Sequence, residues 1–189
     1  MLLAVIAHHA DRNTGRAQLT WDELCAKAHL SRGKVSAGLT ILTDKGLIVR
    51  EPEGRSTFKL SNFGQEDRWA MLPARGMYSG ESVTAFRDFH LRLRAELDAL
   101  KIYLLLAGRR DRTTNVAVLG YEKIESYSGV GRGFIRPALS LLASQSMIHI
   151  TNNPSSVDPN GISNVYRLVH LEPRRHPGTS GRSDGMLGA

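Results

Sequence analysis

The sequence repeats itself at an offset of 100 residues, and this repeat constrains the fold more than any other feature. The two stretches align without a gap over about fifty residues, and the identities include charged and turn residues as well as apolar ones. Matched pairs include Ala7 with Ala107, Asp11-Arg12 with Asp111-Arg112, Arg32-Gly33 with Arg132-Gly133, and Leu39 with Leu139. Later the register shifts by eight, where Phe58-Lys59-Leu60 resembles Tyr166-Arg167-Leu168. The 189-residue chain therefore contains two copies of one small module, the second with a longer loop before its last strand.

The first copy predicts three helices followed by a two-stranded hairpin. A Thr-x-x-Glu capping box at Thr20 starts the second helix, and Ser31 caps the third. Apolar residues recur at helical spacing after Ser31, and Gly46 ends that helix. The predicted elements are helices over 2–10, about 21–28 and 32–45, and strands over 47–50 and 55–63.

Three motifs carry a family resemblance. They are Thr-Trp-x-Glu-Leu from Thr20, Leu-Ser-Arg-Gly-Lys-Val from Leu30, and Leu-x-x-Leu-x-x-x-Gly-Leu-Ile from Leu39. Residues 19–50 thereby resemble the winged helix-turn-helix modules of bacterial phage and plasmid replication proteins and of related transcriptional regulators. Residues 98–150 resemble the same family through Tyr-Glu-Lys-Ile and Gly-Val-Gly-Arg-Gly-Phe-Ile. The resemblance implies a mainly α fold with small β-hairpins (α+β), made of two tandem winged helix-turn-helix domains joined by a long helix.

The expected domain organisation follows from the repeat and from the stretch between its copies. Leucines at coiled-coil-like spacing predict one long helix over 81–107, which either packs against the first copy or pairs with a second chain as a homodimer. The expected parts are domain 1 over 1–63, a linker and connector helix over 64–94, domain 2 over 95–171, and a disordered tail over 172–189.

The resemblance implies double-stranded DNA as the partner. A formal net charge of +7, from 25 basic and 18 acidic residues, favours an anionic partner only weakly, because the excess is spread along the chain. The expected DNA contacts of the first copy are Thr20, Ser31, Arg32, Lys34, Ser36, Ala37, Thr40 and Arg55. Those of the second copy are Arg109, Arg110, Arg112, Arg132, Phe134, Arg136, Ser140 and Arg167.

Each expected contact has a chemical role. Arg32 and Lys34 reach a guanine edge or a phosphate, helix hydroxyls hydrogen-bond to either, and the Ala37 methyl suits a thymine methyl. Ser31, with the helix N-terminus behind it, holds a phosphate, and Arg55 contacts the backbone or minor groove from the wing. In the second copy, Arg109, Arg110 and Arg112 form a phosphate clamp, as three arginines close together in the sequence.

The second copy departs from the pattern in three ways. Gly131 stands where Ser31 caps the first copy, and Pro137 predicts that the helix begins later or is kinked. The wing over 152–163 is long and polar, without Lys or Arg. We therefore expect the first copy to be the better base reader, and the second to contact DNA, another protein or a second chain.

Other function classes lack sequence support. The single Cys25 excludes an internal disulfide and a thiolate zinc cluster, the seven histidines lack metal-ligand spacing, and Gly129-Val-Gly131-Arg-Gly133 follows a predicted helix, unlike a nucleotide loop. The longest apolar runs have six residues. We expect no enzyme activity, cofactor, metal, small-molecule ligand or membrane segment.

The sequence thus predicts a sequence-specific binder of duplex DNA, acting as a transcriptional regulator on the bacterial nucleoid in the cytoplasm. One alternative is a plasmid or phage replication initiator. The other is a protein-interaction module that uses the same fold without DNA.

Overall fold

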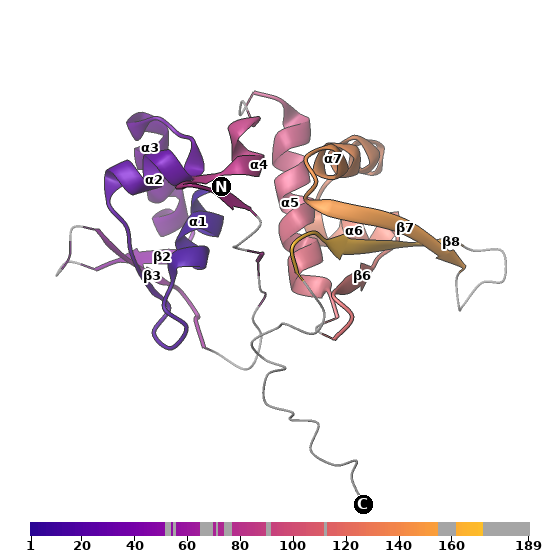
Figure 1. Ribbon diagram of the computed structural model, residues 1–189, viewed down its shortest axis with the longest axis horizontal. Coiled ribbons are helices and arrows are strands. Elements are labelled where there is room, and N and C mark those ends of the chain that lie inside the picture. Colours follow the sequence, from indigo (N-terminus) through magenta and orange to yellow (C-terminus); the bar gives the residue numbers. More distant parts are fainter. Residues whose placement is uncertain are drawn as a thin grey trace, which may run out of the picture. The chain divides into compact units, whose positions relative to one another are not determined.

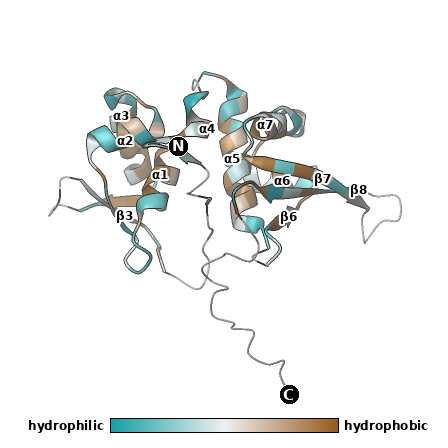
Figure 2. Ribbon diagram, viewed as in Figure 1, coloured by the Kyte–Doolittle hydropathy of each residue, from teal (hydrophilic) through white to brown (hydrophobic). Residues whose placement is uncertain are grey.

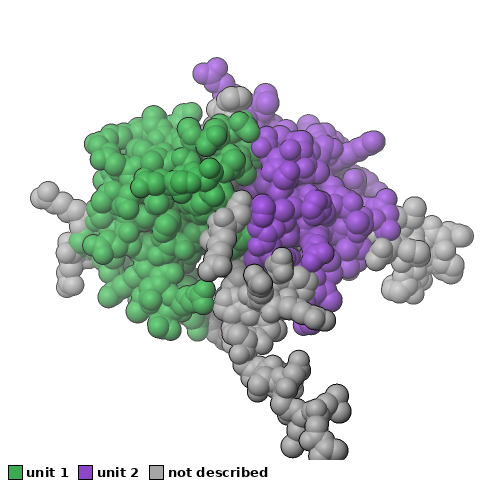
Figure 3. All heavy atoms as spheres, in the orientation of Figure 1, with its two compact units in different colours: residues 1–91 green, residues 92–189 purple. Residues whose placement is uncertain are grey.

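Helices and small antiparallel sheets alternate along the chain, which places the protein in the mixed α+β class (Figure 1). The structure is a computed structural model that describes residues 1–51, 54, 56–64, 70, 72–73, 77–89, 92–111, 113–154 and 162–171. The chain forms two compact units, residues 1–91 and residues 92–189 (Figure 3). The tail expected over 172–189 lies outside the described residues.

Unit 1 consists of a helical group and a three-stranded sheet, followed by a small second hairpin. The elements are α1 (Leu2–His9), β1 (Arg16–Gln18), α2 (Trp21–Ala28), α3 (Arg32–Asp44), β2 (Ile48–Arg50), β3 (Thr57–Leu60), β4 (Tyr78–Ser79), β5 (Ser82–Val83) and α4 (Thr84–Arg87). The sheet has the antiparallel order β1-β3-β2, with Ala17 opposite Phe58 and Val49 opposite Lys59. β1 was not predicted, because three residues are too few to show a period and the strand exists through its pairing with β3.

Unit 2 repeats the first six of these elements in the same order. They are α5 (Arg94–Arg109), β6 (Val116–Val118), α6 (Tyr121–Ser128), α7 (Arg132–Ser144), β7 (Ile148–Pro154) and β8 (Ile162–Leu168). The sheet order β6-β8-β7 is that of unit 1. β7 and β8 have seven residues each, whereas β2 and β3 have three and four.

The same turn follows the first helix in both units. Asp11 Oδ1 accepts the Thr14 backbone N–H at 2.8 Å, and Asp111 Oδ1 accepts the Thr114 backbone N–H at 2.7 Å. These bonds, with those from the threonine hydroxyls, lower the pKa of both carboxyl groups. The polar identities of the repeat therefore have a structural cause, since each aspartate organises a turn.

The core of each unit lies under one stripe of its third helix. Val35 and Leu39 of α3 are completely buried, together with Leu24 of α2. The corresponding positions of unit 2 hold Ile135, Leu139 and Ile124, of which the first and last are fully buried and Leu139 is 3% exposed. Figure 2 shows hydrophobic residues along the helices that surround these positions. Leu42, the next position at helical spacing on α3, is only half-buried. Leu142 is fully buried in unit 2, where the 16-residue α5 packs along α7.

The prediction of one helix over 81–107 is wrong. α4 ends at Arg87, and α5 begins only at Arg94. Phe89, between them, is buried in unit 1, and the Glu96 side chain accepts the Arg92 backbone N–H at 3.2 Å, which secures the start of α5. Local periodicity did not show the break, because burial of Phe89 is a long-range effect.

The stretch after the first copy packs against that copy, which was one of the two expected alternatives for it. Val83 and Phe89 are buried, and β5 packs on α2. The Tyr78 hydroxyl oxygen lies 3.3 Å from His8 Nδ1, which is a hydrogen-bond distance. Burial lowers the pKa of His8 to about 4, with the neighbouring His9 adding to the effect, so His8 is neutral at physiological pH. Residues 77–89 thus complete unit 1.

Pro137 does not delay the start of α7. The helix begins at Arg132, 100 residues after the start of α3. Glu125 Oε1 accepts the Arg132 backbone N–H at 3.0 Å, which replaces the missing serine cap at Gly131. The helix then continues through Pro137 to Ser144.

Among the helices that the structure describes, none combines the length and apolar character that a membrane crossing requires. In the same residues, no group of His, Cys, Asp and Glu side chains is arranged to hold a metal ion.

Substituting Leu39→Ala should destabilise unit 1 by about 2–5 kcal/mol, because it removes a fully buried side chain and leaves a cavity. The matched control is Ile41→Ala on the same helix, where the side chain is 58% exposed and the expected cost is within about 0.5 kcal/mol. Urea unfolding followed by circular dichroism measures both. Equal losses in the two variants would contradict the assignment of the buried stripe.

Candidate nucleic-acid interface

The outward face of α3 carries small, hydroxyl and cationic side chains. Because Val35 and Leu39 face the core, the opposite side of the helix is fixed toward solvent. Its exposed residues are Arg32, Gly33, Lys34, Ser36, Ala37 and Thr40, followed toward the end of the helix by Ile41 and Asp44. Ser31 caps the helix by accepting the Lys34 backbone N–H at 3.5 Å. The structure therefore brings together all the expected contacts of this helix on one accessible surface.

Two of these side chains already have partners within the unit. Arg32 forms an ion pair with Asp22 at 2.6 Å, in which both side chains are largely exposed. Thr40 Oγ1 donates to the Ser36 carbonyl oxygen at 3.1 Å. Since exposed ion pairs are weak, an incoming phosphate can compete for the Arg32 guanidinium.

The N-terminus of α2 is closed by its own side chains. Thr20 Oγ1 accepts the Glu23 backbone N–H at 3.2 Å, and Glu23 Oε2 accepts the Thr20 backbone N–H at 2.7 Å, which is the predicted capping box. The Thr20 backbone N–H, and after it the Thr20 hydroxyl that donates to Glu23 Oε2 at 2.8 Å, lower the pKa of Glu23. The Thr20 hydroxyl and the negative Glu23 leave little room for a phosphate at this helix end.

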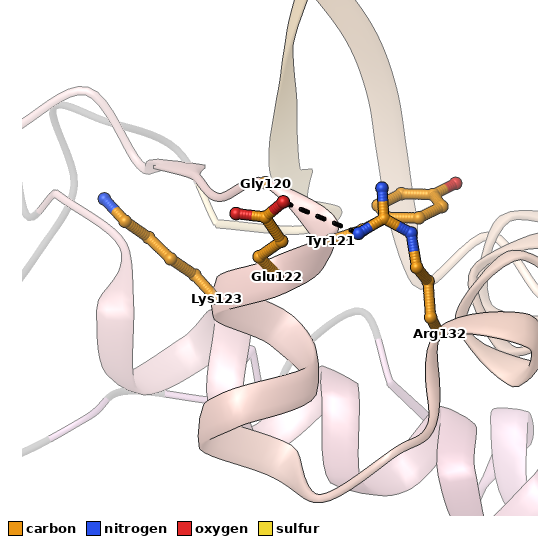
Figure 4. Close-up of a pocket in the computed structure, with 5 residues that line it drawn as sticks. All are labelled: Gly120, Tyr121, Glu122, Lys123 and Arg132. Atoms are coloured by element: carbon orange, nitrogen blue, oxygen red, sulfur yellow. Dashed lines mark ion pairs between the residues drawn. The ribbon is translucent and has the colours of Figure 1, made fainter.

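The equivalent N-terminus of α6 is different. Gly120 and Lys123 stand where Thr20 and Glu23 stand in unit 1, and Gly120 provides no side-chain cap. A shallow depression of about 230 Å³ lies there, lined by Gly120, Tyr121, Glu122, Lys123 and Arg132 (Figure 4). Arg132 pairs with Glu122 at 3.6 Å, the counterpart of the Arg32–Asp22 pair. Lys123, Arg132 and the Glu122 carboxylate that pairs with Arg132 thus line one depression at a helix end without a side-chain cap.

The outward face of α7 is bulkier and less polar than that of α3. The expected contacts Arg132, Phe134, Arg136 and Ser140 are all exposed on it. Phe134 is 45% exposed, and the Arg94 guanidinium lies 3.8 Å from its ring centroid. Arg94 also pairs with the buried Asp98 at 3.3 Å. Arg94 therefore stacks on the Phe134 ring and also balances the charge of the buried Asp98 carboxylate.

The structure describes two of the three arginines of the expected phosphate clamp, and one of these two is buried. Arg110 is only 7% exposed, because it follows the last residue of α5 and lies close enough to the buried Tyr103 to oppose the rise in that group's pKa. Arg109 is exposed and stacks over the Tyr127 ring at 4.2 Å. Arg112 lies outside the described residues.

The remaining expected contacts belong to the hairpins. Arg167 is exposed on β8, opposite His149 and Val116. Arg55 lies outside the described residues, but Arg50 and Lys59, on β2 and β3, are exposed cations of the first hairpin that were not predicted.

Arg94 and Lys123 are the other candidate residues that the sequence reasoning missed. The repeat alignment already pairs Lys123 with Glu23, so comparing charges across the repeat would have found it. Arg94 had no such signal, since it meets Phe134 only through packing of α5 on α7.

Comparisons with known proteins add no family assignment. No family model matches the chain, and no curated protein sequence matches it. The interpretation of this surface therefore depends on its geometry and chemistry.

The double substitution Gly120→Thr with Lys123→Glu should install a capping box on α6 and stabilise unit 2 by about 0.5–2 kcal/mol. The backbone of Gly120 is extended and a Cβ there meets open space, so threonine fits. The reciprocal control, Thr20→Gly with Glu23→Lys, should destabilise unit 1. Thermal unfolding measures both, and a destabilised Gly120→Thr, Lys123→Glu variant would contradict the open helix end.

Proposed function

We propose that each unit is a winged helix-turn-helix domain and that the protein binds duplex DNA sequence-specifically as a transcriptional regulator. The element order supports this, since α2 and α3, like α6 and α7, are joined by a short turn and followed by a hairpin. The left-handed residues His29 and Gly129 make these turns at equivalent positions. The observation that carries the proposal is the outward face of α3, which is exposed, rich in small residues and cationic at its start.

In this proposal α3 enters the major groove. Gly33 and Ala37 let the helix backbone approach the base pairs, and the Ala37 methyl can contact a thymine methyl. Lys34 and Arg32 reach guanine edges or phosphates near the helix start, and Ser36 donates to a base or phosphate oxygen. The core stripe opposite these residues fixes the helix rotation that this contact needs.

Phosphate contacts flank the proposed groove contact. The α3 N-terminus and Ser31 are one site, because backbone N–H groups and the helix dipole favour an anion there. The depression at α6, with Lys123 and Arg132, is another in unit 2. Arg110 is left out of the proposed contacts because it is buried.

The two alternative functions predict different results. A plasmid or phage replication initiator would bind DNA in the same way but at iterated sites of a replication origin. A protein-interaction module would show only weak, sequence-independent DNA binding. No observation in the structure favours either over regulation.

Selection of duplexes from a random DNA pool, followed by fluorescence anisotropy at several salt concentrations, tests the proposal. The selected duplex should bind at least about 10³-fold more tightly than random DNA, with a steep salt dependence. Lys34→Ala should weaken this binding by about 1–3 kcal/mol if it contacts a base. Lys45→Ala is the matched control, because it removes the same charge at the far end of α3. Weak binding without sequence preference would refute the proposal.

We also propose that a homodimer forms through α5. Leu93, Leu97 and Leu104 lie at coiled-coil spacing and are 63%, 56% and 39% exposed, so the predicted stripe is largely uncovered. Sedimentation equilibrium should show a dimer for the natural chain and a monomer for Leu97→Glu. Lys45→Glu, at the end of α3, is the control for added charge. A monomeric natural chain would contradict the dimer without affecting the DNA proposal.

A further inference from the structure

The outer half of the hairpin β7–β8 extends beyond the third strand of its sheet. β7 and β8 pair over seven residues, from Ile148 opposite Leu168 to Pro154 opposite Ile162. β6 pairs only with Val165–Arg167. Figure 2 shows the change along the hairpin, from hydrophobic near the helices to hydrophilic farther out. The outer half is therefore a two-stranded ribbon that β6 does not reach.

Two amide side chains face the same side of this outer half. Asn152 lies opposite Asn164, and cross-strand partners project from the same face of a sheet. Two residues nearer the helices, Ile150 lies opposite the buried Tyr166, so the amides continue the core-facing side where the core ends. Asn152 is exposed and Asn164 is half-buried.

The amide pair adjoins the depression at the start of α6. The Asn164 carbonyl oxygen accepts the Leu119 backbone N–H at 3.4 Å, immediately before α6. Burial raises the pKa of Tyr166 to about 12, and the nearby Tyr121 adds to the rise. Tyr121 also lines the depression that holds Lys123 and Arg132. The amide pair therefore lies on strands that adjoin the segment leading into α6, where this depression begins.

The chemistry of this hairpin suits bases better than phosphates. Among the described residues of this hairpin, Arg167 is the only one that belongs to the types Lys, Arg, Asp and Glu. The first hairpin has the two cations Arg50 and Lys59. An amide offers a donor and an acceptor in fixed geometry, which matches base edges, for example adenine, but gives no net attraction to a phosphate. The absence of charge therefore does not remove the second hairpin from DNA contact.

We propose that Asn152 and Asn164 are specificity-determining residues that read base edges of duplex DNA, while Lys123 and Arg132 beside them bind phosphates. This proposal rests on the proposed DNA binding. It reverses the expectation that a hairpin without Lys or Arg makes the second copy the poorer base reader.

Asn152→Ala and Asn164→Ala test the proposal, with the duplex selected from the random pool and its full set of single base-pair substitutions as probes. Each variant should lose about tenfold or more of the preference at one or two adjacent base pairs, because a bidentate amide contact supplies that discrimination. The dependence of log affinity on log salt should keep its slope, because no phosphate contact is lost.

Two control variants separate base reading from other effects. Thr151→Val changes an exposed residue on the opposite face of the same strand and should leave base preference unchanged. Lys123→Ala should weaken binding to all duplexes alike and lower the salt slope by about one. A circular dichroism melting curve that matches that of the natural chain shows that an asparagine variant folds. Asn152→Leu is a second variant, which removes the amide while nearly keeping the shape of the side chain.

The outcomes distinguish this inference from the proposed function. If the natural chain shows no sequence preference, the proposed function fails. If it binds specifically but Asn152→Ala and Asn164→Ala keep every base preference, or weaken all duplexes equally, the inference alone is overturned. Unchanged DNA binding would leave a protein contact as the role of the amide face.

Discussion

Burial of one stripe on α3, and of the matching stripe on α7, is the constraint on which the rest of the structure depends. Val35 and Leu39 have no exposed surface, so α3 cannot rotate about its axis without losing core packing. The side chains on the other face are then held toward solvent in a fixed order. A helix that was not packed in this way would not present Lys34, Ser36 and Ala37 as one surface.

The ends of the helices make the two units chemically different although their elements correspond. α2 closes its own N-terminus with Thr20 and Glu23, whereas α6 has Gly120 and Lys123 at these positions and remains open. α7 in turn takes its cap from Glu125 of the preceding helix, not from a serine. Two copies of one architecture thus carry different electrostatic surfaces, which fits two unlike halves of one DNA site under the proposed function.

Local sequence signals predicted the elements with short-range causes. The capping box at Thr20, the serine cap at Ser31 and the helix over 21–28 are found where they were expected, because hydrogen bonds between residues three apart define them. The prediction of one helix over 81–107 was wrong because heptad-like spacing does not show that Phe89, between α4 and α5, is buried. Arg110 looked like a surface cation beside Arg109, but the end of α5 turns it inward.

By itself, the sequence determined that the chain has two similar modules and where their main helices begin, because repeats and caps are encoded in residues close together in the sequence. Only the tertiary structure decided which of the similar polar residues are accessible and which meet. Arg94 reaches Phe134 across 40 residues of sequence, and Asn152 meets Asn164 through strand register. Such pairs depend on long-range packing and pairing, which no local pattern records.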